Sequence, residues 1–191
     1  RAIQGAAAPE AARLSGRIQA LASELVSLQN EDGGWPWIPV VEDQSSPSDV
    51  ATSSRAAWAL NYADGLGLLS DRNVMEKGVN YLSSVFSKNP IPSDPETRAM
   101  VIHALSTRKR ASFEAANSIN RARQNLPNAA LAYLAMTFAN LDREGLAREV
   151  LDLLSRRAKT ESAGPGRPPL SYWTSEGSNS WHSSSIEVTA L

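Results

Sequence analysis

The sequence predicts an all-α fold built from helical hairpins. Apolar residues recur at helical spacing along almost all of the 191 residues, and no convincing alternation of apolar and polar residues predicts a strand. In addition, alanine-rich segments with few charges alternate with segments that carry one apolar stripe and one charged face. Because small residues let helices approach closely, the alanine-rich segments suit an inner layer and the striped segments an outer layer.

Eight helices are expected in chain order. Their approximate ranges are 9–29, 48–66, 71–87, 93–110, 112–123, 125–138, 142–159 and 185–191. The even-numbered helices are the alanine-rich ones, and the odd-numbered helices are the amphipathic ones. Before the fourth helix, either Ser93 and Glu96 form a capping box or Asp94 caps the helix alone, with Pro95 in the first turn. Serines 183–185 are expected to cap the eighth helix.

Alternating inner and outer helices predict a ring of hairpins, an α/α toroid, with an open solenoid as the alternative. Eight helices would form an incomplete ring. Residues 186–191 resemble the opening turns of an apolar helix. We therefore expect residues 1–191 to form a single domain that is a fragment of a larger toroid, with any targeting signal outside the fragment.

Composition excludes several classes of function. Hydrophobic residues make up 42% and charged residues 20%, as in a packed domain, and the net charge of −1 predicts no global attraction to nucleic acid or anionic membranes. No apolar run approaches the roughly 20 residues that span a bilayer. The absence of cysteine removes disulfides, thiolate metal sites and cysteine nucleophiles together. No cofactor and no metal site are predicted.

Two long loops, at 30–47 and 160–182, interrupt the helical pattern, and loops of this length are usually functional or mobile. Each loop carries two tryptophans: Trp35 and Trp37 in the first, Trp173 and Trp181 in the second.

The first loop holds the most specific motif of the chain. In the favoured interpretation, Gly33 and Gly34 form a tight turn after a helix, Gln29 bonds the last helical turn, and Trp35 folds back over the hairpin as a staple. In the alternative interpretation, Trp35 and Trp37 form a ledge that stacks on a ligand or a partner, which makes these two residues the candidate binding site.

Catalytic interpretations have weaker support. His103 lies within an inner-type helix, where a buried, hydrogen-bonded histidine is the favoured interpretation. His182 follows Trp181 in a serine-rich loop, but neighbours in sequence do not make a catalytic triad, and no Gly-x-Ser-x-Gly elbow occurs. Basic residues at 108–110 and 156–157 are expected to oppose the helix dipole, with a phosphate site as the alternative.

Carboxylates gather loosely near the starts of inner helices, which leaves a toroidal glycosidase as an open hypothesis. Capping and the helix dipole already explain several of them. The set comprises Asp32, Glu42, Asp43, Asp49, Asp94, Glu96 and Glu176.

Several stretches resemble the thioester-bearing α/α toroid domain of alpha-2-macroglobulin and complement-like proteins, and the compact loops fit the bacterial branch of that family. The matching stretches are 25–35 (LVSLQNEDGGW), 52–60 (TSSRAAWAL), 80–84 (NYLSS), 128–133 (NAALAY) and 185–191 (SIEVTAL). The family's Gly-Cys-Gly-Glu-Gln motif is absent and would lie upstream of Arg1. The histidine that assists acyl transfer in thioester members is also missing between Ser87 and Asp94.

The resemblance implies a non-catalytic structural and interaction domain of a large exported protein, periplasmic or secreted, that inhibits proteases by trapping them without covalent capture. Its implied partners are target proteases, reached through the full-length protein, and neighbouring β-sandwich domains of the same chain. The alternative is a fragment of a toroid enzyme, either a terpene cyclase or prenyltransferase relative or a polysaccharide lyase or glycosidase. Gln29, Gly33 and Trp35 match the cyclase Gln-Trp spacing, but the acidic cyclase motifs are missing.

Overall fold

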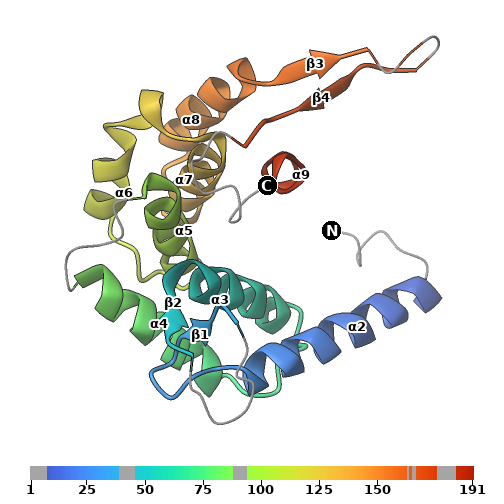
Figure 1. The fold of residues 1–191 in the computed structure, drawn as a ribbon, viewed down its shortest axis with the longest axis vertical. Coiled ribbons are helices and arrows are strands. Elements are labelled where there is room, and N and C mark those ends of the chain that lie inside the picture. Colours follow the sequence, from blue (N-terminus) through green and yellow to red (C-terminus); the bar gives the residue numbers. More distant parts are fainter. Residues whose placement is uncertain (1–7, 39–45, 88–93, 163, 165–166, 176–183) are drawn as a thin grey trace. The chain divides into compact units, whose positions relative to one another are not determined.

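The computed structural model describes residues 8–38, 46–87, 94–162, 164, 167–175 and 184–191. The chain forms two compact units, unit 1 at Arg1–Asn89 and unit 2 at Pro90–Leu191. Figure 1 labels their elements. The expectation of a single domain over 1–191 stays a prediction, so each unit is described by itself. Within the described residues, no helix combines the length and apolar character that crossing a bilayer requires.

The described residues of unit 1 form three helices and one small sheet. Its elements are α2 (Ala8–Ser27), β1 (Trp35–Pro36), β2 (Ser48–Asp49), α3 (Val50–Gly65) and α4 (Asn73–Ser87). Helix α3 packs against both α2 and α4. Its N-cap is Asp49, whose carboxylate accepts hydrogen bonds from the backbone N–H and the hydroxyl of Thr52, both at 2.7 Å. The core of the unit joins Leu60 of α3, Met75 of α4 and Trp35 of β1.

The part of unit 2 that the structure describes forms five α-helices, one 3₁₀ turn and a hairpin. Its elements are α5 (Pro95–Ser106), α6 (Phe113–Asn120), the 3₁₀ turn η1 (Arg123–Asn125), α7 (Asn128–Asn140), α8 (Glu144–Arg156), β3 (Lys159–Glu161), β4 (Leu170–Tyr172) and α9 (Ser185–Ala190). Helix α7 packs against α5, α6 and α8. Most of its side chains are buried, whereas α8 buries only the stripe Ala147, Val150 and Leu153. Within unit 2, an alanine-rich helix is therefore enclosed and an amphipathic helix covers it.

The eight predicted helices are all present among the described residues, with ends that differ by a few residues. Asp94 caps α5 by accepting from the Thr97 N–H at 2.9 Å, while Ser93 lies outside the described residues. Ser184 caps α9 by accepting from the Glu187 N–H at 3.2 Å, as predicted for the serine run.

The prediction of a chain without strands is wrong. Strand β1 pairs with β2 in antiparallel register, with Trp35 opposite Asp49, and β3 pairs with β4, with Thr160 opposite Ser171. Both ladders lie at the two long loops of the sequence. A ladder of two or three residues is too short to show the alternating pattern by which a strand is recognised. Over the residues that the structure describes, the chain is therefore mostly helical, with two small hairpin-like sheets.

Candidate functional site

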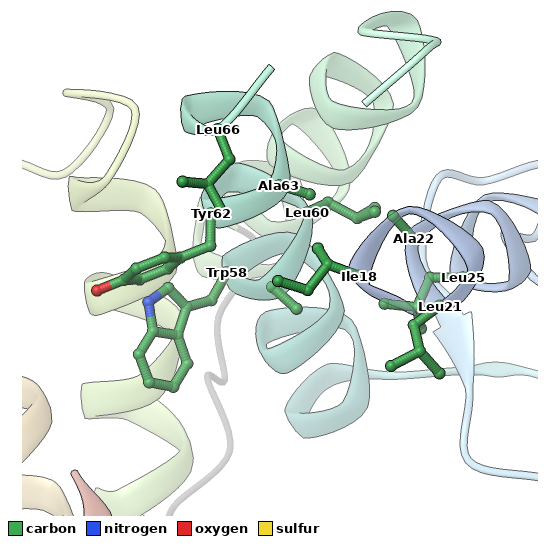
Figure 2. A pocket seen from close by; sticks show the side chains of 10 residues that line it. Ile18, Leu21, Ala22, Leu25, Trp58, Leu60, Tyr62, Ala63 and Leu66 are labelled. Atoms are coloured by element: carbon green, nitrogen blue, oxygen red, sulfur yellow. The ribbon is translucent and has the colours of Figure 1, made fainter. Parts of the chain in front are cut away.

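An apolar groove of about 370 Å³ runs along unit 1 between α2 and α3. Figure 2 shows α2 contributing Ile18, Leu21 and Leu25, while α3 contributes Trp58 and Tyr62. Leu21 is 53% exposed and Tyr62 is 64% exposed, so large apolar surfaces meet solvent here. A contiguous exposed apolar surface of this kind typically marks a contact site.

A second, smaller hollow of about 270 Å³ extends this surface toward the first long loop. It is lined by Trp37 together with Thr52, Arg55 and Ala56, and it shares Leu25 and Ala59 with the groove. Trp37 is 52% exposed, and its neighbour Ile38 is exposed as well. Binding by Trp37 stays a prediction, but the structure places this side chain at the end of a continuous apolar surface.

The groove follows from the residue pattern of α3. The small side chains of the alanines on this helix form the floor of the groove. Trp58, Tyr62 and Leu66 are spaced four residues apart, so they lie on one face of the helix next to these alanines. Trp58 and Tyr62 meet edge to face, with ring centroids 6.2 Å apart. This face was not predicted from the sequence. The spacing of these three side chains is the signal that would have found it.

Trp35 is a core residue. Its side chain is 1% exposed, its indole Nε1 donates to the Leu25 carbonyl at 2.7 Å, and its backbone N–H donates to the Ser53 hydroxyl at 2.8 Å. A Cβ on Gly78 of α4 would lie 2.9 Å from the indole, so the ring and this helix are in close contact. This geometry agrees with the helix-end staple. The Trp35 ring has no face open to a ligand. Trp35 and Trp37 therefore do not form the stacking ledge of the alternative interpretation.

The turn before Trp35 is held by side-chain hydrogen bonds. The Gln29 amide donates to the carbonyls of Gly33 and Val74, each at 2.9 Å, which ties the end of α2 to α4. Asp32 accepts from the Gly34 N–H at 2.9 Å and from the Ser48 hydroxyl at 2.7 Å. Gly33 has a φ of 90°, and a Cβ there would lie 2.5 Å from the Lys77 carbonyl oxygen. Only glycine fits this position.

Tyr81 of α4 completes this cluster. Its hydroxyl donates to the Ser48 carbonyl at 3.2 Å. Burial, with the nearby carboxylates of Asp32 and Asp49 as smaller causes, raises the pKa of the Tyr81 phenol above its usual value. The phenol therefore stays protonated at neutral pH and serves as a structural donor.

His103 of α5 is buried in unit 2, with 3% exposure. Its ring lies 5.7 Å from the ring of Tyr133 on α7, measured between centroids. Burial lowers the pKa of His103 to about 4, because the charged imidazolium loses its hydration, and the ring is neutral at pH 7. The burial agrees with the favoured prediction for this position, while the hydrogen bonding that it also predicted stays a prediction. His182 and Trp181 lie outside the described residues.

The described carboxylates of the glycosidase hypothesis have local structural roles. Asp32 holds a turn, while Asp49 and Asp94 cap helices. Glu96 is buried in the first turn of α5. Glu42, Asp43 and Glu176 lie outside the described residues. Within the described residues, no cluster of three or more histidine and carboxylate side chains could hold a metal ion.

Basic residues at helix ends bind carbonyl oxygens in unit 2. Lys109 follows α5 and donates to the Asn140 carbonyl at the end of α7, with Asp142 at 3.4 Å. Arg157 follows α8 and donates to the carbonyls of Leu126 and Gln124, each at 2.6 Å. Lys109 thus binds a C-terminal carbonyl of α7 and Arg157 binds carbonyls of the turn before α7, so neither contact is with the end of its own helix, and the predicted role toward the helix dipole stays a prediction.

Comparison with known proteins finds no matching family model and no matching curated protein. Solved structures do match. The crystal structure of native alpha-2-macroglobulin from Escherichia coli, from domain MG7 to the C-terminus, aligns with a TM-score of 0.61 at 14% identity, covering 76% of this chain and 24% of that one. The cryo-EM structure of the native E. coli protein gives the same TM-score and identity, and 10% of its chain is covered.

The crystal structure of trypsin-activated E. coli alpha-2-macroglobulin also matches, with a TM-score of 0.57 and 15% identity over 71% of this chain and 10% of that one. This chain therefore spans a quarter or less of the length of the structures that it matches. At such low identity the likeness concerns the fold alone. The fold resembles part of a bacterial alpha-2-macroglobulin.

Proposed function

We propose that the chain is a non-catalytic structural and interaction domain of a large alpha-2-macroglobulin-like protein, and that it contributes there to the trapping of proteases. The observation that carries this proposal is the fold match to E. coli alpha-2-macroglobulin in both its native and its trypsin-activated forms. An exported location, periplasmic or secreted, belongs to the same proposal.

The same proposal includes the architecture of an incomplete α/α toroid. Support comes from the contrast between helices within unit 2. Helix α7 is apolar on all sides and enclosed by α5, α6 and α8, whereas α8 buries one stripe and exposes a charged face. An α/α toroid is a double ring of helices. It needs inner helices that other helices contact on several sides and outer helices that expose one face to solvent.

The groove is the proposed interaction surface, and its proposed occupant is a neighbouring domain of the same polypeptide. The matched E. coli chain extends far beyond the part that this chain covers, so a protein built in that way has further domains available to occupy the groove. The lining is apolar, and Trp37 extends it with an exposed aromatic ring. Tryptophan and tyrosine are favoured anchors in protein contacts because they bury much area at low entropic cost.

The enzyme alternative has less support. The glycosidase form of this alternative requires a pocket in which two carboxylates face each other. None of the ten residues that line the groove is a carboxylate, and the carboxylates Asp49 and Asp94 serve as helix caps. A toroid enzyme would instead need acidic side chains with free oxygens facing a substrate.

Trypsin trapping tests the proposed function directly. The full-length polypeptide would be incubated with trypsin, and hydrolysis of a large protein substrate would be compared with hydrolysis of a small chromogenic peptide. A trap excludes the large substrate sterically and leaves the small one accessible, so we expect casein hydrolysis to fall at least tenfold while peptide hydrolysis is retained. Equal loss of both activities, or loss of neither, would contradict trapping. The isolated 191-residue chain serves as the control and is expected to leave both activities unchanged.

The contact role of Trp37 has its own test. In the full-length polypeptide, Trp37→Ala should increase the rate of limited proteolysis between this domain and its neighbours, because an anchor of their interface is lost. Thr160→Val, a substitution on the exposed β3–β4 hairpin, is the matched control. An unchanged rate of limited proteolysis in Trp37→Ala would mean that Trp37 is not part of the proposed interface. The fold assignment would not be affected by that result.

A further inference from the structure

The β3–β4 hairpin of unit 2 has an open strand edge. Lys159, Thr160 and Glu161 of β3 are all exposed, and among the described residues β4 alone pairs with β3. In an antiparallel pair, the N–H and C=O groups of alternate residues point away from the partner strand. Such groups on an exposed edge are a template for pairing with another strand.

The two edges of this hairpin differ. Pro168 and Pro169 directly precede β4, and proline has no N–H to donate to a ladder. Helix α9 also packs against β4. Strand β3 is flanked by Ala158 and Ser162, so its backbone carries an N–H at every position. A further strand is therefore expected to add at β3.

The hairpin is small for a structure of its own. It consists of three residue pairs, and an isolated two-stranded hairpin is only marginally stable in water. The Tyr172 hydroxyl donates to the Glu161 carboxylate at 2.5 Å, which ties the two strands together on one face. On the same face Leu170 is 61% exposed. A strand added at β3 would supply further backbone hydrogen bonds and so stabilise the hairpin.

The charges of β3 are self-complementary. When a second copy of β3 lies antiparallel to the first, with Thr160 opposite its counterpart, Lys159 lies opposite Glu161 of the second copy and Glu161 lies opposite Lys159. Opposite charges at directly opposed positions stabilise a strand pair. Both charged contacts of this pairing are of that kind.

The same charges select the register. Two identical antiparallel strands are related by a two-fold axis perpendicular to the sheet, so opposed side chains point to the same face. The neighbouring registers that meet this condition place Lys159 opposite Lys159, or Glu161 opposite Glu161. Like charges directly opposite each other destabilise a strand pair. The register centred on Thr160 is therefore favoured over both.

We propose that β3 is an interface between two copies of this chain, which pair about Thr160 into a four-stranded sheet of order β4–β3–β3–β4. The contact involves three residues from each copy of β3, so it is smaller than the interface of a stable dimer. Association is weak and reversible, with a dissociation constant on the order of 0.1–1 mM. This self-association goes beyond the proposed trapping of proteases and does not depend on it.

Charge reversal tests the proposed pairing. Lys159→Glu gives a strand with two glutamates, and Glu161→Lys gives a strand with two lysines, so each variant can pair with itself only through like charges. Sedimentation equilibrium of the 191-residue chain should show a dissociation constant about tenfold higher for each variant than for the parent. An equimolar mixture of the two variants should associate like the parent, because every opposed pair then carries opposite charges.

Lys77→Glu is the matched control for charge. It makes the same change in net charge on the exposed face of α4 and should leave association unchanged. The proposal would be overturned by a parent chain that stays monomeric at millimolar concentration, or by single variants that associate as strongly as the parent. It would also be overturned by a mixture that associates no better than the separate variants, because the substitutions would then act by disrupting the hairpin.

Disulfide cross-linking tests the position of the two-fold axis, because the chain has no cysteine of its own. Thr160→Cys brings two thiols to opposed positions, with Cβ atoms roughly 4.5–5.5 Å apart, close to the distance that a disulfide requires. Ser171→Cys is equally exposed but lies on the outer strand of the proposed sheet. We expect covalent dimers of Thr160→Cys to form about tenfold faster than those of Ser171→Cys. Adding Lys159→Glu should cancel this difference. Equal rates for the two cysteine variants would contradict the proposed sheet.

Discussion

Helices α3 and α7 belong to the same class by sequence but have different surroundings. Both are rich in alanine and carry few charges. Helix α7 buries its large side chains, Leu131, Tyr133 and Phe138, among α5, α6 and α8. Helix α3 buries Leu60 but leaves Tyr62 exposed at the surface, where it lines the groove. The comparison shows that an apolar helix becomes an enclosed helix only where neighbours cover every side, and that a side left open becomes an apolar groove.

The largest expected effect concerns the enclosed helix. Leu131→Ala removes a fully buried side chain from α7 and should lower the free energy of unfolding by about 2–5 kcal/mol, because lost transfer energy and a new cavity add together. Leu21→Ala in the groove is the matched control, and its cost should stay below about 1 kcal/mol. Urea denaturation measures both. Similar losses for the two variants would mean that the groove is as well packed as the core.

Protonation of His103 should destabilise unit 2 as the pH falls. The pKa is about 4 in the folded chain and 6.5 for an unperturbed histidine, so between these values the unfolded chain binds more protons. The contribution of His103 to stability is therefore fully present above pH 6.5 and is lost as the pH drops toward 4, by up to about 3 kcal/mol for this shift.

A comparison of urea denaturation for the parent chain and His103→Gln over this pH range isolates the histidine from the carboxylates. The substitution should remove the contribution that depends on His103. Parallel stability curves for the two proteins would contradict the burial argument.

Gly78→Ala tests the close packing around the buried tryptophan of unit 1. The new methyl group would lie 2.9 Å from the Trp35 ring and should cost about 1–3 kcal/mol through overpacking. Gly145→Ala on α8 is the control, because nothing lies within 4 Å of its new methyl group, and it should stabilise the chain by up to about 1 kcal/mol. Thermal denaturation reports both changes. A neutral Gly78→Ala would show that α4 can move away from the indole.

The smallest effect on stability is expected at the groove itself. The double substitution Leu21→Gln and Tyr62→Gln should change the free energy of unfolding by less than about 1 kcal/mol, since both side chains are more than half exposed. The same variant should bind less of a fluorescent apolar dye, because the surface that binds it is lost. Dye titration measures the loss of binding, and urea denaturation measures the change in the free energy of unfolding. A large loss of stability would place these two side chains in the core.

Local chemistry alone determined much of the architecture. The period of apolar residues predicted all eight helices, and Asp94 and Ser184 cap their helices through short-range bonds that a sequence motif can indicate. The Gly-Gly-Trp turn was predicted because φ > 0 and a helix-end staple depend on neighbours within a few residues. Each of these features depends on residues close to it in the sequence, so the local sequence is enough to predict it.

Features that depend on distant segments were decided by tertiary structure. The short strands pair across loops, with Trp35 opposite Asp49, and leave no pattern of their own. Burial of Trp35 and exposure of Trp37 depend on α4 reaching over one ring and not the other, so the sequence could not distinguish the two. The groove arises for the same reason: α2 covers only part of α3. Exposure is a property of what packs against a side chain, and segments remote in sequence supply that packing.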